Sequence, residues 1–390
     1  MFRLDIPQAQ YRQTWDVPYS SRLQTLTDGK FRIAFYYGLM PDSGTFRYRI
    51  YNMVNSLNSL GGDVSAAWFY YGELDRLSDV VEKTDVLVVC RGKYCDRLGH
   101  VLAVARNKGV RIVFDIDDLM FDPAYMHLTI KSADANYTRF SREEVWQYWY
   151  GDCARYAASL ALCDDAVTTN EFLADRIHQY SGKDVTVLPN YLNEEQLVYS
   201  RQIYRQKKAS GFARQGPLYL GYFSGSHSHN HDFQMLTDPL IALFGKYDNL
   251  KLRIVGLLDI DKRLAEWSNR IERYPLQDYI TLQKLIGEVE INLVPLQVNA
   301  FTNSKSELKY FEAGIVGTLS MATPTSVYAR AIRDGYNGFL VNSYEWYSKI
   351  DGLLSAMDLY PELAGNTFHD VEEKYAWNNL VDRIVKTYQG

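Results

Sequence analysis

Short apolar segments recur along this chain, and each is separated from the next by a stretch long enough for a helix. The first series of predicted strands covers 32–36, 64–68, 85–90, 111–116, 166–169 and 185–188. The second series covers 218–223, 252–255, 280–282, 291–294, 319–322 and 338–341. The apolar runs are mostly continuous, which is typical of parallel strands with helices on both faces. The pattern therefore predicts an α/β fold with two successive doubly wound sheets.

The repeated pattern is interrupted between residues 193 and 216, where polar and basic runs replace the apolar segments. We therefore expect a domain boundary here, with a linker that has room for a helix. The predicted parts are an irregular N-terminal extension (1–30), a first domain (31–192), the linker (193–216), a second domain (217–368) and a C-terminal helix (369–390). The helix is predicted from the helical spacing of Trp377, Leu380, Ile384 and Tyr388.

Composition limits the classes of function that this chain can serve. A length of 390 residues is enough for two hydrophobic cores. The formal net charge of -5 argues against a nucleic-acid-binding protein, because such proteins usually carry a basic surface. The chain shows no signal peptide and no apolar run of about 18 residues. We therefore expect a soluble cytoplasmic protein, and peripheral association with the inner face of a membrane stays open.

The strongest functional signal is a charged cluster of mixed sign in the second domain. Lys305, Glu307, Lys309 and Glu312 lie where a loop is expected to enter a helix, after the predicted strand at 291–294. Open α/β sheets bind nucleotides at this place. Glu312 can accept hydrogen bonds from both ribose hydroxyls, and either lysine can neutralise a leaving diphosphate. The alternative is a solvated amphipathic helix with charge pairs one turn apart.

A second candidate is the loop after the first strand of the second domain. It combines small residues with three histidines at alternate positions, His227, His229 and His231. The backbone N–H groups around Gly225 and Ser226 would suit a diphosphate. A structural loop is one alternative. A metal site formed by the histidines is another, although it would need an extended strand.

The third candidate follows the first strand of the first domain. Gly44 would let the backbone approach a ligand, and Arg47 and Arg49 would face an anionic group or the acceptor. An ordinary turn at the start of a helix is the alternative. The segment lacks the GxGxxG pattern, so the sequence does not predict a nicotinamide or flavin dinucleotide.

The fourth candidate is a group of aspartates, Asp115, Asp117 and Asp118, at the end of the fourth strand. They could bind a divalent metal ion. The other interpretations are an acceptor-side carboxylate, a general base and a network that caps the following turn. His127 lies nearby in the sequence and could face the same cleft.

Longer segments of 31–390 resemble the GT-B glycosyltransferases of family GT4. The resembling segments are 166–174, 185–190, 312–317, 332–341 and the last helix around Trp377. Three further segments resemble a bacterial subgroup that is associated with surface polysaccharides, and they are 115–118, 223–233 and 305–309. The resemblance rests on the order and spacing of these segments together.

The resemblance implies two facing Rossmann-like domains and a C-terminal helix that crosses back to the first domain. It implies transfer of a sugar from a nucleoside-diphosphate donor to a glycan or lipid-linked glycan acceptor, in bacterial surface polysaccharide or glycoconjugate synthesis. It also implies that the reaction needs no metal and no cofactor besides the nucleotide sugar. Whether the nucleotide is UDP, GDP or dTDP stays open.

The resemblance also implies roles for individual residues. Glu312 matches the ribose-binding second glutamate of the family's E-x7-E signature, but the first position of that signature is Ser304 in this chain. Glu307, or the backbone nearby, is expected to replace the missing glutamate. The donor-binding residues are then Gly225, Ser226, His227, Asn303, Lys305, Ser306, Lys309 and Glu312, and the acceptor or phosphate side holds Gly44 and Arg47.

Enzymes of this family typically retain the anomeric configuration, and the leaving phosphate helps to deprotonate the acceptor. The prediction is therefore a retaining glycosyltransferase. Inversion would need a base from the first domain, for which Asp115, Asp117 and His127 are the candidates. Two other functions stay open: a nucleotide-sugar 2-epimerase of the same fold, and a non-catalytic glycan-binding or scaffold protein.

Overall fold

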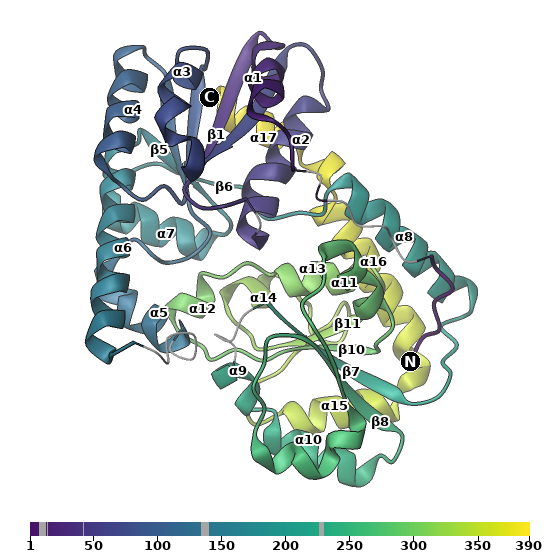
Figure 1. The fold of residues 1–390 in the computed structure, drawn as a ribbon. Helices are drawn as coiled ribbons and strands as arrows, with labels where there is room; N and C mark the ends of the chain where they lie inside the picture. The colour runs from purple at the N-terminus through teal and green to yellow at the C-terminus, as the bar shows by residue number, and fades with distance from the viewer. Residues whose placement is uncertain (8–12, 14, 42, 134–139, 226–229) are drawn as a thin grey trace.

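The computed structural model describes residues 1–390 except 8–12, 14, 42, 134–139 and 226–229. The described part forms two six-stranded sheets, in which all paired strands run parallel (Figure 1). The first sheet has the order β2 (Val64–Tyr70), β1 (Phe31–Tyr37), β3 (Val86–Cys90), β4 (Arg111–Asp115), β5 (Asp165–Thr168) and β6 (Val185–Val187). The second has the order β12 (Phe339–Leu340), β11 (Leu319–Ala322), β10 (Ile291–Val294), β7 (Leu218–Ser224), β8 (Leu250–Gly256) and β9 (Ile271–Tyr274). We call the halves built on these sheets the first and second domains.

Helices connect the strands and cover the sheets (Figure 1). The first half of the chain has α1 (Tyr19–Thr27), a π-helix η1 (Phe46–Tyr51), α2 (Asn52–Asn58), α3 (Leu77–Val81), α4 (Asp96–Asn107), α5 (Met126–Ala133), α6 (Arg142–Leu162) and α7 (Glu171–Ser181). The second half has α8 (Glu194–Ala209), α9 (Asn230–Gln234), α10 (Thr237–Lys246), α11 (Tyr279–Gly287), α12 (Ala300–Asn303), α13 (Leu308–Gly314), α14 (Ser326–Ala331), α15 (Trp346–Ser355), α16 (Tyr360–Tyr375) and α17 (Val381–Gln389). Short 3-10 helices lie at Tyr71–Arg76, Pro123–Tyr125, Lys262–Arg270, Met357–Leu359 and Trp377–Asn379.

The predicted strands overlap observed strands with one exception. The prediction for 280–282 is wrong, because these residues lie in α11. Asp278 starts that helix: its side chain accepts hydrogen bonds from the backbone N–H groups of Ile280 and Thr281, at 2.9 and 2.8 Å. The sequence pattern also missed β9, an edge strand whose four residues include a glutamate and an arginine.

The segment between the domains contains helix α8, which is capped by the Asn193 side chain. This helix packs against α11 of the second domain. Its residues Leu197, Ile203 and Tyr204 are part of the hydrophobic core around the second sheet. Helix α8 therefore shares its packing with the second domain.

The expectation of irregular structure at residues 1–30 is wrong for Tyr19–Thr27, which form α1. Arg22 of this helix is buried, and its guanidinium donates to the carboxylate of Glu73. Phe2 packs in the core of the second domain, whereas Trp15 packs in a core of the first. The N-terminal segment therefore contacts both domains.

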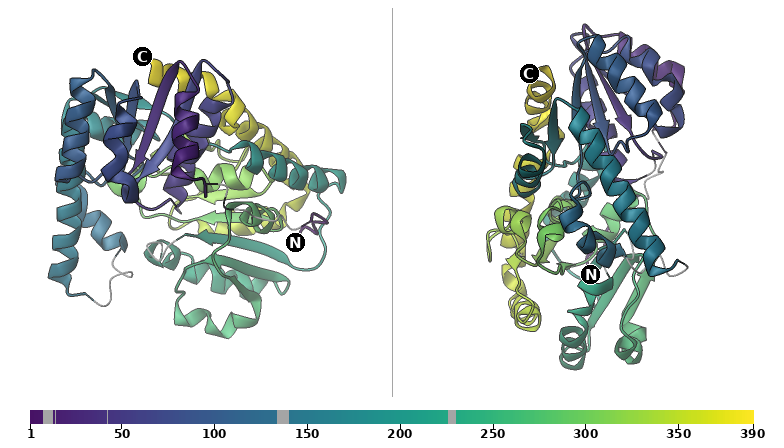
Figure 2. Two further views of the ribbon diagram at one scale, coloured as in Figure 1. Left: turned by 45° about the horizontal axis from the view of Figure 1, so that its top comes forward. Right: turned by 90° about the vertical axis from the view of Figure 1, so that its left-hand side faces the viewer.

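The C-terminal segment crosses from the second domain to the first, as the resemblance implied (Figures 1 and 2). The expected helix is interrupted: α16 ends at Tyr375, and Ala376 has an extended backbone with a ψ of 133°. Ile384 and Tyr388 of α17 then pack in the core of the first domain. Figure 2 shows α16 and α17 running along one side of the molecule.

Candidate functional site

A pocket of about 230 Å³ lies where the carboxyl ends of the two sheets meet. The first domain contributes Gly44, Thr45, Tyr48, Arg91, Asp117, Asp118 and Asn190. The second domain contributes Val294, Leu296, Lys305, Ser306, Leu308, Lys309 and Tyr328. Loops that follow parallel strands therefore form this pocket, which is the common place for a ligand in open α/β sheets.

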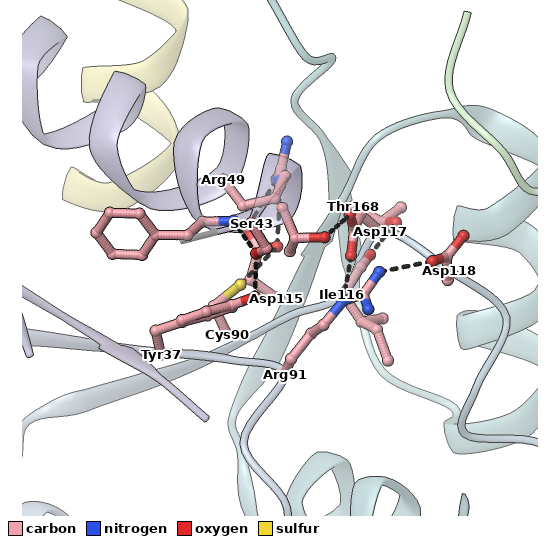
Figure 3. A network of polar contacts seen from close by, with 12 residues as sticks. Tyr37, Ser43, Arg49, Cys90, Arg91, Asp115, Ile116, Asp117, Asp118 and Thr168 are labelled. Carbon is pink, nitrogen blue, oxygen red and sulfur yellow. Dashed lines mark hydrogen bonds and ion pairs between the residues drawn. The ribbon is translucent and has the colours of Figure 1, made fainter. Parts of the chain in front are cut away.

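Charges of alternating sign cross the pocket from one domain to the other. The Arg91 guanidinium donates to Asp117 through Nε and to Asp118 through Nη2, both at 2.6 Å (Figure 3). Lys305 of the second domain donates to the other oxygen of Asp118 at 3.0 Å. Burial raises the pKa of Asp118, but Lys305 and Arg91 outweigh burial and hold it below its usual value. The Thr45 hydroxyl donates a hydrogen bond to the second oxygen of Asp117 at 2.9 Å.

Arg91 directly follows strand β3, and its backbone has a φ of 46°. This left-handed conformation is unusual for a residue with a side chain. The chain passes so close here that a Cβ atom at Gly38 would overlap the carbonyl oxygen of Arg91. A glycine at position 38 is therefore needed for the Arg91 backbone to lie this close, with its side chain beside the two aspartates.

Lys309 is the cation in this pocket that has no carboxylate partner among the described residues. Its ammonium lies 4.9 Å from the ring centroid of Tyr222. Burial lowers the pKa of Lys309 from 10.5 to about 8, although Asp232 and Glu312 act in the opposite direction. Because the lysine is only partly compensated, an anion in the pocket would stabilise its charged form.

Glu312 lies next to the pocket and is bound by residues of the first domain. The Tyr48 hydroxyl donates to Glu312 Oε1 at 2.6 Å. The Arg47 Nη2 atom lies 3.5 Å from the same oxygen, and the Arg47 guanidinium lies between the rings of Tyr48 and Tyr279, 4.4 Å from each centroid. Burial raises the pKa of Glu312 and Arg47 opposes that shift. The predicted ribose ligand thus contacts the first domain directly.

Asp115 does not reach the pocket. Both of its oxygens accept hydrogen bonds from Arg49, at 3.0 and 2.7 Å, and both side chains are fully buried (Figure 3). Arg49 also donates to the carbonyl oxygen of Leu188 at 2.6 Å. The geometry therefore does not support Asp115 as a base or metal ligand, or Arg49 as an acceptor-facing residue. The pair joins η1, β4 and the segment after β6 inside the first domain.

The region around the missing glutamate holds its polar groups in local hydrogen bonds. The Ser304 hydroxyl donates to the carbonyl oxygen of Ala300 at 2.8 Å, and its own carbonyl accepts from Asn170 at 2.9 Å. Glu307 accepts from the Tyr375 hydroxyl at 2.8 Å, and burial raises its pKa. Glu307 is not among the residues that line the pocket, so its position does not bring it to a ligand there.

The other predicted residues are placed differently. Ser306 lines the pocket and accepts from the Asn190 amide at 3.2 Å. The side-chain oxygen Oδ1 of Asn303 accepts from the backbone N–H of Ser326 at 2.8 Å, which fixes the start of α14. His127 is exposed and does not line this pocket, and Gly225 is also exposed outside it.

Two predicted residues, Ser226 and His227, lie outside the described residues, as does His229. In the part of the chain that the structure describes, no group of three or more metal-ligating side chains converges on one point. Among the helices described here, none has the length and apolar composition needed to cross a lipid bilayer.

Sequence reasoning missed five polar residues that line the pocket: Thr45, Tyr48, Arg91, Asn190 and Tyr328. Arg91 and Asn190 each lie within three residues of the end of a predicted strand, so strand ends were the signal available for them. Tyr48 lies between the two arginines that the sequence singled out. Its role depends on Glu312, which is distant in sequence and carries no local signal.

Comparison with known proteins shows a likeness at the level of the fold. Neither a protein-family model nor a curated protein matches the chain. HepE of Anabaena, solved in complex with UDP, aligns over 92% of this chain and 99% of its own, with a TM-score of 0.61 and 12% identity. A glycosyltransferase of Rickettsia africae aligns over 92% of this chain and 98% of its own, with a TM-score of 0.63 and 14% identity.

A third structure is WaaG, a glycosyltransferase involved in lipopolysaccharide biosynthesis. It aligns over 92% of this chain and its whole length, with a TM-score of 0.57 and 15% identity. Identities this low establish the architecture and leave activity to be argued from the site. The two facing parallel sheets, the pocket between them and the returning C-terminal helix therefore give this chain the GT-B fold of these glycosyltransferase structures.

Proposed function

We propose that this chain is a glycosyltransferase that moves a sugar from a nucleoside-diphosphate donor to a glycan acceptor. The observation that carries the proposal is the convergence of Arg91, Lys305 and Lys309 from two domains on one pocket. Lys309 has no carboxylate partner among the described residues, and a diphosphate would supply the missing negative charge. A leaving nucleoside diphosphate needs such fixed positive charge where its own charge develops.

In this proposal the second domain binds the donor. Lys305 and Lys309 contact the diphosphate, and Glu312 binds the ribose. Uridine diphosphate is the first nucleotide to test, because HepE was solved with UDP, with UDP and glucose, and with UDP-glucose. The acceptor then enters from the first domain, near Gly44 and Asp117.

We further propose that the reaction retains the anomeric configuration. Asp117 and Asp118 are the carboxylates that line the pocket, and both are bound by Arg91. Both oxygens of each carboxylate already accept hydrogen bonds, from Arg91 and Thr45 on Asp117 and from Arg91 and Lys305 on Asp118. This arrangement favours deprotonation of the acceptor by the leaving phosphate. The charge needed at the diphosphate comes from the chain's own cations, so the proposal includes no metal.

The proposed setting is the synthesis of a bacterial surface polysaccharide or glycoconjugate, in the cytoplasm at the inner face of the membrane. Its support is the resemblance of the sequence to the GT4 subgroup, together with the fold shared with WaaG, whose own role is in lipopolysaccharide biosynthesis. A glycan or lipid-linked glycan would then be the acceptor.

The test is a calorimetric and thermal-shift comparison of UDP, GDP, dTDP and ADP binding. We expect the wild type to bind one of them, Glu312→Ala to lose most of that affinity while staying folded, and the exposed-site control Glu362→Ala to behave as wild type. Transfer of the matching sugar would follow with glycan acceptors, and nuclear magnetic resonance would give the anomeric configuration. Binding of none of the four nucleotides would favour a scaffold, and conversion of the nucleotide sugar without an acceptor would favour an epimerase.

A further inference from the structure

A buried polar cluster lies at the junction of η1, α8 and α13. Tyr48 is 1% exposed and Glu312 is 5% exposed, and their hydrogen bond joins the two domains. Gln196 of α8 is fully buried, and its side-chain amide lies beside the Tyr48 hydroxyl and the Glu312 carboxylate. Tyr48 lines the proposed donor pocket, whereas Glu312 and Gln196 are not among its lining residues.

The Gln196 amide is poorly satisfied in this arrangement, although it interacts with Tyr48 and Glu312. Neither its Nε2 nor its Oε1 makes a well-formed hydrogen bond with any described residue, and the same is true of Arg47 Nε. A buried polar group without a partner destabilises the state that contains it. The closed junction therefore holds the Gln196 amide close to the Glu312 carboxylate, but without a hydrogen bond of good geometry.

Separation of the domains would change these contacts unequally. Helix α8 shares the core of the second domain through Leu197 and Ile203, so Gln196 would stay with Glu312. The η1 helix is anchored in the core of the first domain through Phe46 and Ile50. Tyr48 would therefore leave Glu312 while Gln196 remains beside it.

The size of the pocket supports such an opening. Its volume of about 230 Å³ is below the range of roughly 300–1,000 Å³ that is usual for ligand pockets. A donor with a base, a ribose, a diphosphate and a sugar needs more room than this. For the donor proposed above, the arrangement with Tyr48 on Glu312 is therefore a closed state, and a wider cleft is needed to admit the donor.

We propose that Tyr48 and Gln196 are alternate positioning residues for Glu312. Tyr48 binds it in the closed, donor-free chain, and Gln196 binds it in the open chain, where it holds the carboxylate ready for the ribose. The ribose hydroxyls then take the place that the Tyr48 hydroxyl leaves. The inference rests on the proposed function in one respect, which is the role of Glu312 toward the donor.

Two conservative substitutions test the proposal because they shift the equilibrium in opposite directions. Tyr48→Phe removes the bond that holds the closed state, so the free protein should show a larger radius of gyration in small-angle X-ray scattering. Its Kd for UDP should fall by about tenfold, because a hydrogen bond to a charged group no longer has to be broken. Gln196→Leu removes the unsatisfied amide from the closed state and the partner of Glu312 from the open state. Its melting temperature should rise and its Kd for UDP should increase by about tenfold.

Matched controls separate this switch from ordinary packing effects. Tyr191→Phe removes another buried tyrosine hydroxyl of the first domain, which bonds the Ser56 hydroxyl at 2.9 Å. Gln283→Leu removes another fully buried amide without a partner among the described residues, on α11. Neither control should change the radius of gyration or the Kd for UDP.

The proposal is overturned if Tyr48→Phe leaves the radius of gyration unchanged, or if it weakens UDP binding. It is equally overturned if Gln196→Leu lowers the melting temperature and leaves UDP affinity as in the wild type, since that result describes a purely structural glutamine. Scattering and melting use the free protein, so they test the switch even when the wild type binds no UDP. Failure of UDP binding in the wild type would count against UDP as the donor nucleotide and leave the switch to these two measurements.

Discussion

Lys309 should make nucleotide binding depend strongly on pH above neutrality. Burial lowers the pKa of this lysine from 10.5 to about 8 in the free protein. A diphosphate in the pocket would favour the charged ammonium, so the nucleotide would bind to the protonated form of Lys309. The affinity should be fully present well below pH 8 and should be lost as the pH rises through that value.

The size of the effect follows from the fraction of Lys309 that carries a proton. The apparent Kd grows by the factor 1 + 10^(pH − pKa), which is about 1.1 at pH 7 and about 11 at pH 9 for a pKa of about 8. The expected loss between these two pH values is therefore about tenfold, or roughly 1.4 kcal/mol. An unperturbed lysine with a pKa near 10.4 would change the affinity by only a few per cent over the same range.

The assay is isothermal titration of the nucleotide at pH 7, 8 and 9, in buffers with different enthalpies of ionisation. Near pH 8.5 the wild type should take up a proton on binding. Lys309→Arg should keep the affinity and lose the pH dependence, because a guanidinium stays charged, whereas Lys309→Met should bind weakly throughout. A Kd that is constant from pH 7 to 9, or the same slope in Lys309→Arg, would refute the reasoning.

Three further predictions concern the fold and the chemistry. Arg49→Met leaves Asp115 buried and unpaired, so the free energy of unfolding measured by urea denaturation should fall by about 3–5 kcal/mol. A decrease of less than about 1 kcal/mol would contradict the buried ion pair. Phe301 of α12 is 7% exposed and packs in the core of the first domain, so Phe301→Ala should divide the calorimetric unfolding of the chain into two transitions. A single transition with unchanged width would speak against this anchor. Asp117→Asn should slow transfer by less than about tenfold, whereas a loss of about 10²–10⁴ is expected of a general base and would favour inversion.

Most of the fold could be predicted because its signal is local. Continuous apolar runs indicate buried parallel strands, and each strand can be predicted from its own residues without knowledge of its neighbours. The two wrong strand assignments have physical causes that apolar runs do not reveal: a helix cap and a position at a sheet edge. Residues 280–282 are apolar, but Asp278 caps them into a helix, and the strand Ile271–Tyr274 was missed because it lies at a sheet edge and carries charged residues.

The site could be predicted only in outline. Lys305 and Lys309 were found because they follow a predicted strand, and the structure brings both to the pocket. Asp115 looked equivalent to Asp117 in the sequence, but Arg49, 66 residues away, binds both of its oxygens. The contact of Tyr48 with Glu312 spans 264 residues and two domains, so no local pattern could have indicated it.

The central claim is that a nucleoside diphosphate binds between the two sheets, with its phosphates beside Lys309. The most direct measurement is a crystal structure of the chain with the nucleotide that binds most tightly in the four-nucleotide comparison. We expect the diphosphate within hydrogen-bonding distance of Lys309 and the ribose on Glu312, in a cleft wider than that of the free chain. A nucleotide bound elsewhere on the molecule, with Lys309 and Glu312 unchanged, would contradict the account.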